Sequence, residues 1–186
     1  ALTAFLILLT FNAAAIALGV FSCALVAIYP FAKRFTWWPQ VFLGLAFNWG
    51  AILLWTAHTG EVGLPAVLLY LAGIAWTLHY DTIYAHQDRE DDALIGVKST
   101  ARLFEENTGL WLIGFIAAAG ILGGYAVLAA GGGWPGLAGA AGLTAHMAWQ
   151  ARRLDINDPD RCLALFRETR LGGLAFAAGI ALDIVL

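Results

Sequence analysis

The chain has 186 residues, of which 61% are hydrophobic and 12% are charged, with a formal net charge of −3 and a mean hydropathy of +0.76. An average soluble domain has about 25% charged residues, so the composition excludes an ordinary water-soluble domain. Transmembrane barrels show short segments of alternating hydropathy, and this sequence has long continuous apolar runs instead. We therefore expect an integral membrane protein that contacts lipid and no nucleic acid.

Charge-free runs set the predicted elements in chain order. They cover residues 1–32, 35–60, 62–80, 107–151 and 171–182. A helix that spans a bilayer needs about 20 mostly apolar residues. The fold class expected is all-α, a polytopic transmembrane bundle of about seven helices. The predicted spans are 1–12 (the stump of a helix), 13–32, 38–57, 64–87, 108–130, 134–151 and 170–186.

The loops between these spans fall alternately on two sides, and the basic residues all fall on one of them. The opposite side receives only His58, Glu61 and the turn at 131–133. By the positive-inside rule, the basic side is cytoplasmic. We expect the basic segment 152–170 to be a loop that fixes this topology. The basic residues are Lys33, Arg34, Arg89, Lys98, Arg102, Arg152, Arg153, Arg161, Arg167 and Arg170.

An acidic stretch follows the fourth span on the basic side. If one helix continues through it, Asp81, Asp88 and Asp92 lie within about 40° of one another around its axis, on a stripe with Tyr84. Carboxylates this close repel, and a divalent cation removes the conflict. The stretch thus predicts an Mg²⁺ site at Asp88 and Asp92, with Asp81 as a further candidate ligand. The alternative is a solvated helix end of mixed charge, as expected for Asp91.

Basic residues on the same side are complementary to this acidic site. Lys33 and Arg34 end the second span, and Lys98 and Arg102 follow the acidic stretch. Together with a metal ion they could hold a diphosphate, because guanidinium and ammonium groups donate to phosphate oxygens. Alternatively, they only anchor the spans at lipid headgroups. Asn48 lies within a span and needs a hydrogen-bond partner, in helix packing or on a ligand.

These residues resemble the UbiA superfamily of intramembrane prenyltransferases, and within it the bacterial members that prenylate 4-hydroxybenzoate. The resemblance rests on Tyr29-Pro-Phe-Ala-Lys-Arg34, Trp38-Pro-Gln40, Tyr80-Asp-Thr-Ile-Tyr84 and Asp88-Arg-Glu-Asp-Asp92 with Gly96-Val-Lys-Ser-Thr100. It implies a nine-helix fold, of which residues 1–186 form one transmembrane domain without the first two helices and part of the third. An earlier aspartate-rich motif of the family is not among these residues, so we expect the chain to be inactive alone.

The resemblance also implies an activity: Mg²⁺-dependent transfer of a polyprenyl group from polyprenyl diphosphate to C3 of 4-hydroxybenzoate, in ubiquinone biosynthesis. It implies a bacterial inner membrane, with the active site on the cytoplasmic side. The alternatives are another aromatic or quinone precursor as acceptor, or a cation-coupled transporter that uses the acidic stripe. The expected catalytic residues are Asp88, Asp92 and Arg34. The expected diphosphate ligands are Lys33, Arg34, Lys98 and Arg102, and the expected pocket residues are Asn48, Tyr84 and Asp81.

Overall fold

The computed structural model describes residues 2–186, which form helices and no strand. This confirms the prediction of an all-α bundle. In chain order the helices are α1 (Leu2–Leu8), α2 (Ala13–Phe35), α3 (Pro39–Phe47), α4 (Gly50–Thr59), α5 (Leu64–Ala85), α6 (Arg89–Leu94), α7 (Thr100–Phe104), the 3₁₀ turn η1 (Glu105–Asn107), α8 (Thr108–Ala129), α9 (Trp134–Arg153) and α10 (Pro159–Val185).

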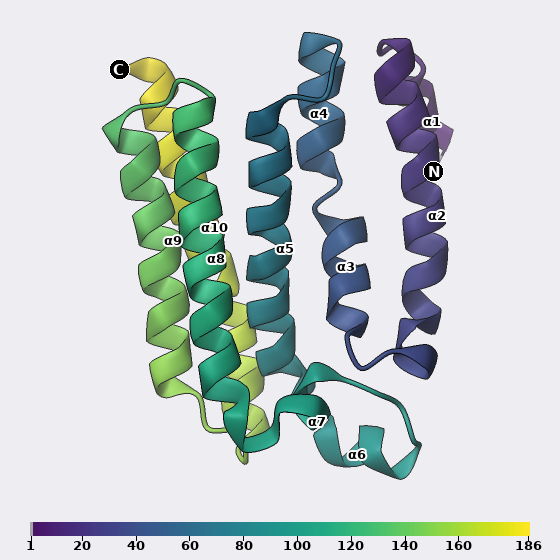
Figure 1. Ribbon diagram of the computed structural model, residues 1–186, viewed down its shortest axis with the longest axis vertical. Coiled ribbons are helices and arrows are strands. Elements are labelled where there is room, and N and C mark those ends of the chain that lie inside the picture. Colours follow the sequence, from purple (N-terminus) through teal and green to yellow (C-terminus); the bar gives the residue numbers. More distant parts are fainter. Residues whose placement is uncertain (1) are drawn as a thin grey trace.

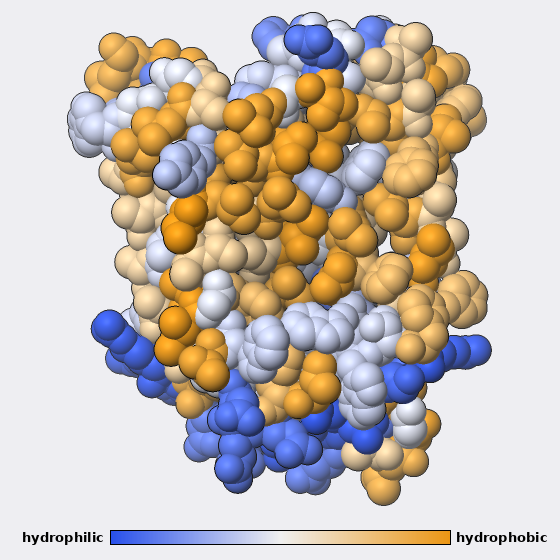
Figure 2. Space-filling model, viewed as in Figure 1, coloured by the Kyte–Doolittle hydropathy of each residue, from blue (hydrophilic) through white to orange (hydrophobic). Residues whose placement is uncertain are grey.

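The long helices run side by side, and the short helices α6 and α7 lie across one end of the bundle (Figure 1). The most extensive packing joins α9 to α10 and α5 to α8. Hydrophilic residues gather at the end that carries α6 and α7, below a broad hydrophobic band (Figure 2). We call this end the charged rim: α6, α7 and the adjoining ends of α2, α5, α9 and α10.

The apolar segments are long enough to cross a bilayer. By length and composition, four segments qualify: 13–35, 39–59, 64–85 and 100–129. Helices α9 and α10 have comparable lengths of 20 and 27 residues but are less apolar. Their glycine and alanine residues suit helix packing within a membrane rather than contact with lipid alone.

Two predicted boundaries differ from those in the structure. The predicted basic loop at 152–170 is helical from Pro159 onward. Asp158 caps this helix by accepting a hydrogen bond from the Arg161 amide at 3.0 Å, and Pro159 occupies the first helical position. The predicted span 64–87 ends at Ala85, before the acidic stretch. Capping by Asp158 and Pro159, rather than hydropathy, thus sets the start of α10.

The predicted span 38–57 is broken at Asn48, between α3 and α4. Asn48 Nδ2 donates to the Gly44 carbonyl and to Thr77 Oγ1 of α5, both at 2.9 Å. Tyr70 Oη donates to the Leu45 carbonyl at 2.9 Å. Side chains from α5 therefore supply hydrogen bonds at the interruption, as an irregular backbone at membrane depth requires. The helix-packing interpretation of Asn48 is thus confirmed.

Helices α9 and α10 touch backbone to backbone. A Cβ atom added to Gly179 would lie 2.6 Å from the Gly139 Cα atom and 2.7 Å from the Pro135 carbonyl oxygen. Beyond this contact, Asp183 Oδ2 accepts a hydrogen bond from the Gly133 amide at 2.8 Å. This hydrogen bond joins α10 to the start of α9 at the end of the bundle opposite the charged rim.

Gly179→Ala should lower the midpoint of thermal unfolding of the detergent-purified natural protein, because overpacking costs about 1–3 kcal/mol. Gly114→Ala is the matched control, since a Cβ there meets nothing within 4 Å. Circular dichroism at 222 nm measures both midpoints, 222 nm being the usual helical band. Equal midpoints for Gly179→Ala and the unsubstituted protein would contradict the close contact.

Candidate functional site

An acidic helix and a lysine from a distant helix meet at the charged rim. Lys33 Nζ, at the end of α2, lies 3.5 Å from Asp92 Oδ2 of α6. Asp92 is only 6% exposed, whereas Lys33 remains about half exposed. The Asp92 amide donates to the Asp88 carbonyl at 2.8 Å, so these two aspartates are one helical turn apart, as predicted. The arrangement presents a buried carboxylate next to an accessible cation.

The predicted stripe of three aspartates on one helix is wrong. Asp81 belongs to α5, and Asp88 begins the separate helix α6. The chain turns at His86, whose Nε2 lies 3.0 Å from Thr108 Oγ1 at the start of α8. Burial, and secondly Arg89, lowers the pKa of His86 to about 4, so the ring is neutral at neutral pH. This tertiary contact ends α5 four residues beyond Asp81.

The carboxylates of Asp81, Asp88 and Asp92 are the predicted ligands of Mg²⁺. Within residues 2–186, no three His, Cys, Asp or Glu side chains come close enough to hold a metal ion together. Asp92 Oδ2 is nevertheless buried and accepts no hydrogen bond there. Mg²⁺ typically takes one or two carboxylates and completes its shell with water and phosphate oxygens. Asp88 and Asp92 fit that smaller role, and Asp81 lies outside the pair.

The loop between α6 and α7 is tied to α2 through its basic residues. The Lys98 amide donates to the Lys33 carbonyl at 3.0 Å, and Lys98 Nζ donates to the Phe35 carbonyl at 3.4 Å. Arg102 Nη1 donates to the carbonyls of Asp92, at 3.3 Å, and Val97. Lys33 and Arg102 therefore contact Asp92 directly, and Lys98 joins the loop to the end of α2.

Arg34 lies apart from this group. Its guanidinium is exposed and sits 5.9 Å from the centre of the Phe31 ring, on its own helix. Lys98 and Arg102 lie against a different ring, that of Trp37. The centre of this ring is 5.8 Å from Lys98 Nζ and 5.4 Å from Arg102 Cζ. Of the two basic residues at the end of α2, the structure thus directs Lys33 toward the acidic helix.

Three buried polar residues anchor the loop, and the sequence interpretation gave them no role. Thr82 Oγ1 of α5 and Thr100 Oγ1 of α7 are 2.7 Å apart, and the Thr100 amide donates to Gln40 Oε1 at 3.4 Å. All three side chains are almost completely buried. All three residues lie inside the motifs quoted for the family resemblance, and this was the signal in the sequence that could have identified them.

Thr100→Val should loosen this loop, because it leaves the buried Thr82 hydroxyl without its partner at a cost of about 1–3 kcal/mol. Hydrogen exchange followed by mass spectrometry should show faster exchange in residues 86–104 and unchanged exchange in α9. Thr59→Val, at the opposite end of the bundle, serves as the control. Unchanged exchange in 86–104 would show that the threonine pair does not hold the loop.

Aromatic side chains of α5 and α10 lie between the charged rim and the interior of the bundle. Tyr84 lies 4.6 Å from Phe166 between ring centres, Tyr80 lies 5.9 Å from Phe166, and Trp76 lies 5.7 Å from Tyr80. We call these four residues the aromatic wall. Of the predicted pocket residues, Tyr84 belongs to this wall, and Asp81 lies between Tyr80 and Tyr84 in the sequence of α5.

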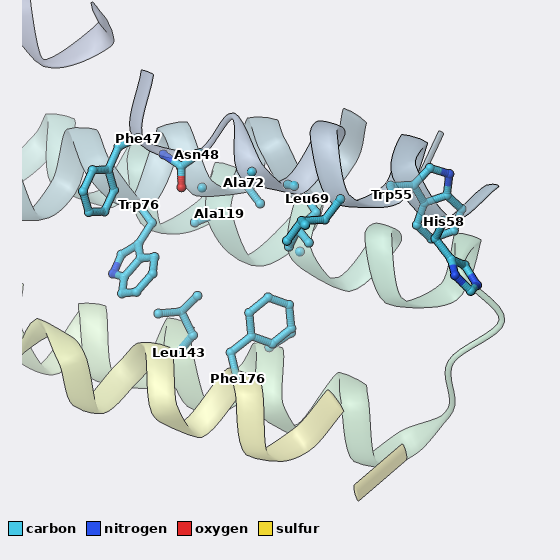
Figure 3. A pocket seen from close by; sticks show the side chains of 16 residues that line it. Phe47, Asn48, Trp55, His58, Leu69, Ala72, Trp76, Ala119, Leu143 and Phe176 are labelled. Atoms are coloured by element: carbon cyan, nitrogen blue, oxygen red, sulfur yellow. The ribbon is translucent and has the colours of Figure 1, made fainter. Parts of the chain in front are cut away.

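Beyond the wall lies an apolar hollow of about 630 Å³, which we call the central cavity. Figure 3 shows Trp76, Leu143 and Phe176 projecting into it from different helices, with Asn48 at one end and His58 at the other. A second hollow of about 380 Å³ shares Trp55, Leu69 and Phe176 with it. Together they extend from the helix break at Asn48 toward the far end of the bundle. Asn48 is thus a lining residue as well as a packing residue.

With this geometry established, comparison with known proteins decides the family. A sequence model described as "UbiA prenyltransferase family" matches residues 1–180. The chain belongs to this family. The resemblance found in the motifs is thereby confirmed over nearly the whole chain.

Named members of the UbiA prenyltransferase family are similar in sequence. A Bos taurus protein named "4-hydroxybenzoate polyprenyltransferase, mitochondrial" is 49% identical over 179 residues. An Arabidopsis thaliana protein of the same name is 46% identical over 178 residues. Both alignments cover 95% of this chain, but only 48% and 44% of the relatives. The chain therefore spans about half the length of these proteins.

A solved structure shares the fold. It is described as "Apo structure of a UbiA homolog from Aeropyrum pernix K1", and it superposes with a TM-score of 0.80 at 24% identity. The match covers 97% of this chain and 68% of that one. Family and spans together identify a multi-pass membrane protein with the UbiA-type fold.

Proposed function

We propose that the natural protein containing this chain transfers a polyprenyl group from polyprenyl diphosphate to C3 of 4-hydroxybenzoate, in ubiquinone biosynthesis. One observation carries the proposal: a charged rim built around Lys33 and Asp92 leads past aromatic residues to an apolar cavity. A polyprenyl diphosphate is divided in the same way: its charged head matches the rim, and its hydrocarbon tail matches the apolar cavity. The names of the relatives supply the acceptor.

The proposed reaction breaks the bond between the allylic carbon and the diphosphate oxygen, and the electron pair leaves with the diphosphate. Ring carbon C3 of the acceptor, ortho to the hydroxyl, then bonds to the allylic carbon, and its proton passes to the diphosphate that has left. Lys33 and Lys98 favour this step because they neutralise the charge that grows on the leaving group. Asp88 and Asp92 would hold Mg²⁺, which would supply further charge neutralisation when bound.

The aromatic wall has a separate role in the proposed reaction. The faces of Tyr84 and Phe166 carry negative π-density, which stabilises positive charge on the allylic carbon. Packing between α5 and α10 also excludes water that would otherwise consume this carbon. The central cavity accepts the isoprenoid tail.

We place the protein in a bacterial inner membrane, with the charged rim on the cytoplasmic side. The confinement of all ten Lys and Arg residues to one side of the predicted topology supports this orientation. The names of the relatives place those proteins in mitochondria, and this location is stated of them alone. A cation-coupled transporter is not favoured, because the family is one of prenyltransferases and the carboxylates lie at one end of the bundle.

Asp92→Asn in the natural full-length protein should reduce prenyl transfer on the order of 100-fold, because the amide carries no negative charge with which to hold a cation. Membranes are assayed with polyprenyl diphosphate, labelled 4-hydroxybenzoate and Mg²⁺. Asp91→Asn is the matched control: this neighbour is exposed and faces a separate outer hollow with Ile156 and Asn157. Full activity of Asp92→Asn would refute its role, and absence of prenylated product from the unsubstituted enzyme would refute the function.

Lys33→Met should raise the KM for polyprenyl diphosphate more than Arg34→Met does, because Lys33 faces Asp92 and Arg34 faces outward. The expected difference is about tenfold, the value of one charge-assisted contact. Steady-state kinetics at saturating acceptor measure both constants. The reverse order would restore Arg34 as the main diphosphate ligand.

A further inference from the structure

Two arginines of α10 face a hollow between the charged rim and the central cavity. This hollow, which we call the arginine pocket, has a volume of about 310 Å³. Its walls come from α3, α5 and α10 and from the helix break. The lining residues are Phe47, Asn48, Trp76, Tyr80, Phe166, Arg167, Thr169 and Arg170.

Arg167 and Arg170 are not at the end of their helix. They follow Pro159 by eight and eleven residues, which places them about 12 and 16 Å along the axis. Their stripe of α10 faces the aromatic wall, since Phe166 packs on Tyr80 and a Cβ at Gly173 would meet the Trp76 ring. Beyond Arg170 the helix carries no charge until Asp183. Both arginines therefore lie at the rim end of α10, directly before its charge-free part.

Neither arginine has an anionic partner in the part of the chain that the structure describes. The one ion pair among residues 2–186 joins Lys33 to Asp92. Thr169, which lies between the two arginines in the sequence, is already engaged with Gln150 Nε2 at 3.0 Å. Both arginine side chains are exposed at this hollow, so they are available to bind an anion that enters it.

The position of the pocket restricts what that anion can be. The pocket shares Phe47, Asn48 and Trp76 with the central cavity and Tyr80 and Phe166 with the aromatic wall. A prenyl diphosphate with its head at the rim and its tail in the cavity has its allylic carbon between them. The acceptor ring must reach that carbon, and it carries a carboxylate.

We propose that Arg167 and Arg170 bind the carboxylate of the aromatic acceptor, with the ring against Phe166 and Tyr80. This inference rests on the proposed function and deepens it by naming acceptor-binding residues. Guanidinium groups suit a carboxylate because they can donate two parallel hydrogen bonds. Binding through the carboxylate leaves the hydroxyl-bearing end of the ring, with its reactive C3, directed away from α10.

Other anions share this chemistry, namely the donor diphosphate and the headgroup of an anionic phospholipid. The test separates them by comparing 4-hydroxybenzoate with 4-hydroxybenzamide, a neutral acceptor of nearly the same shape. The enzyme is the natural full-length protein in nanodiscs of phosphatidylcholine, with and without phosphatidylglycerol. The variants are Arg167→Gln, Arg170→Gln and the double change, with Arg152→Gln as the control. Arg152 is exposed at the end of α9 and lines none of these hollows.

The double variant should lower kcat/KM for 4-hydroxybenzoate about 10- to 100-fold. Its kcat/KM for 4-hydroxybenzamide and its KM for polyprenyl diphosphate should not change. Arg152→Gln should keep the preference for the acid. A general structural defect would lower both acceptors equally, so the ratio reports the carboxylate contact itself. If the glutamine variants do not fold, the double lysine variant is used, and its acid preference should fall part of the way.

Three results would overturn the inference while leaving the function intact: an unchanged ratio of acid to amide, a change in donor KM instead of acceptor KM, or an effect that appears only with phosphatidylglycerol. Failure of the unsubstituted enzyme to prenylate 4-hydroxybenzoate would overturn the function, and the acceptor assignment with it.

Discussion

The cost of burying charge in hydrocarbon is the constraint on which the rest of this structure depends. It keeps Lys and Arg out of the apolar spans and concentrates them where α2, α6, α7, α9 and α10 meet water. A polar substrate group can be bound only where such residues are available. The same constraint leaves the interior free for a hydrocarbon ligand, so one bundle offers two chemically different environments a short distance apart.

Inside the bundle, polar side chains have the task of joining helices. Gln150 of α9 donates to the Leu165 carbonyl at 2.7 Å and to Thr169 of α10 at 3.0 Å. Asn48 and Thr77 join α3 to α5 at the helix break. Such bonds hold long helices in register where apolar packing alone gives little direction, because lipid is as apolar as the side chains. The walls of the central cavity are thus fixed by a few polar contacts.

The two environments meet at the aromatic wall, and this is where the proposed prenyl transfer would take place. The leaving group needs cations, the tail needs an apolar space, and the carbon between them needs a dry place with electron-rich faces. Lys33, the central cavity and Tyr84 supply these three environments respectively, and Tyr84 lies between Lys33 and the cavity. The proposed chemistry therefore follows the change in polarity from the membrane surface to its interior.

Charge-free runs in the sequence determined the spans and the side on which the basic residues lie. The positions of Asp88 and Asp92 in the sequence determined their spacing of one helical turn. These depend on local properties, namely the hydropathy of a segment and the pitch of a helix. Only the tertiary structure decided that α5 ends before Asp88, that Lys33 rather than Arg34 faces Asp92, and that Arg167 and Arg170 belong to a helix facing a pocket. Each of these depends on a contact with a residue far along the chain, such as His86 with Thr108, and hydropathy contains no information about such a partner.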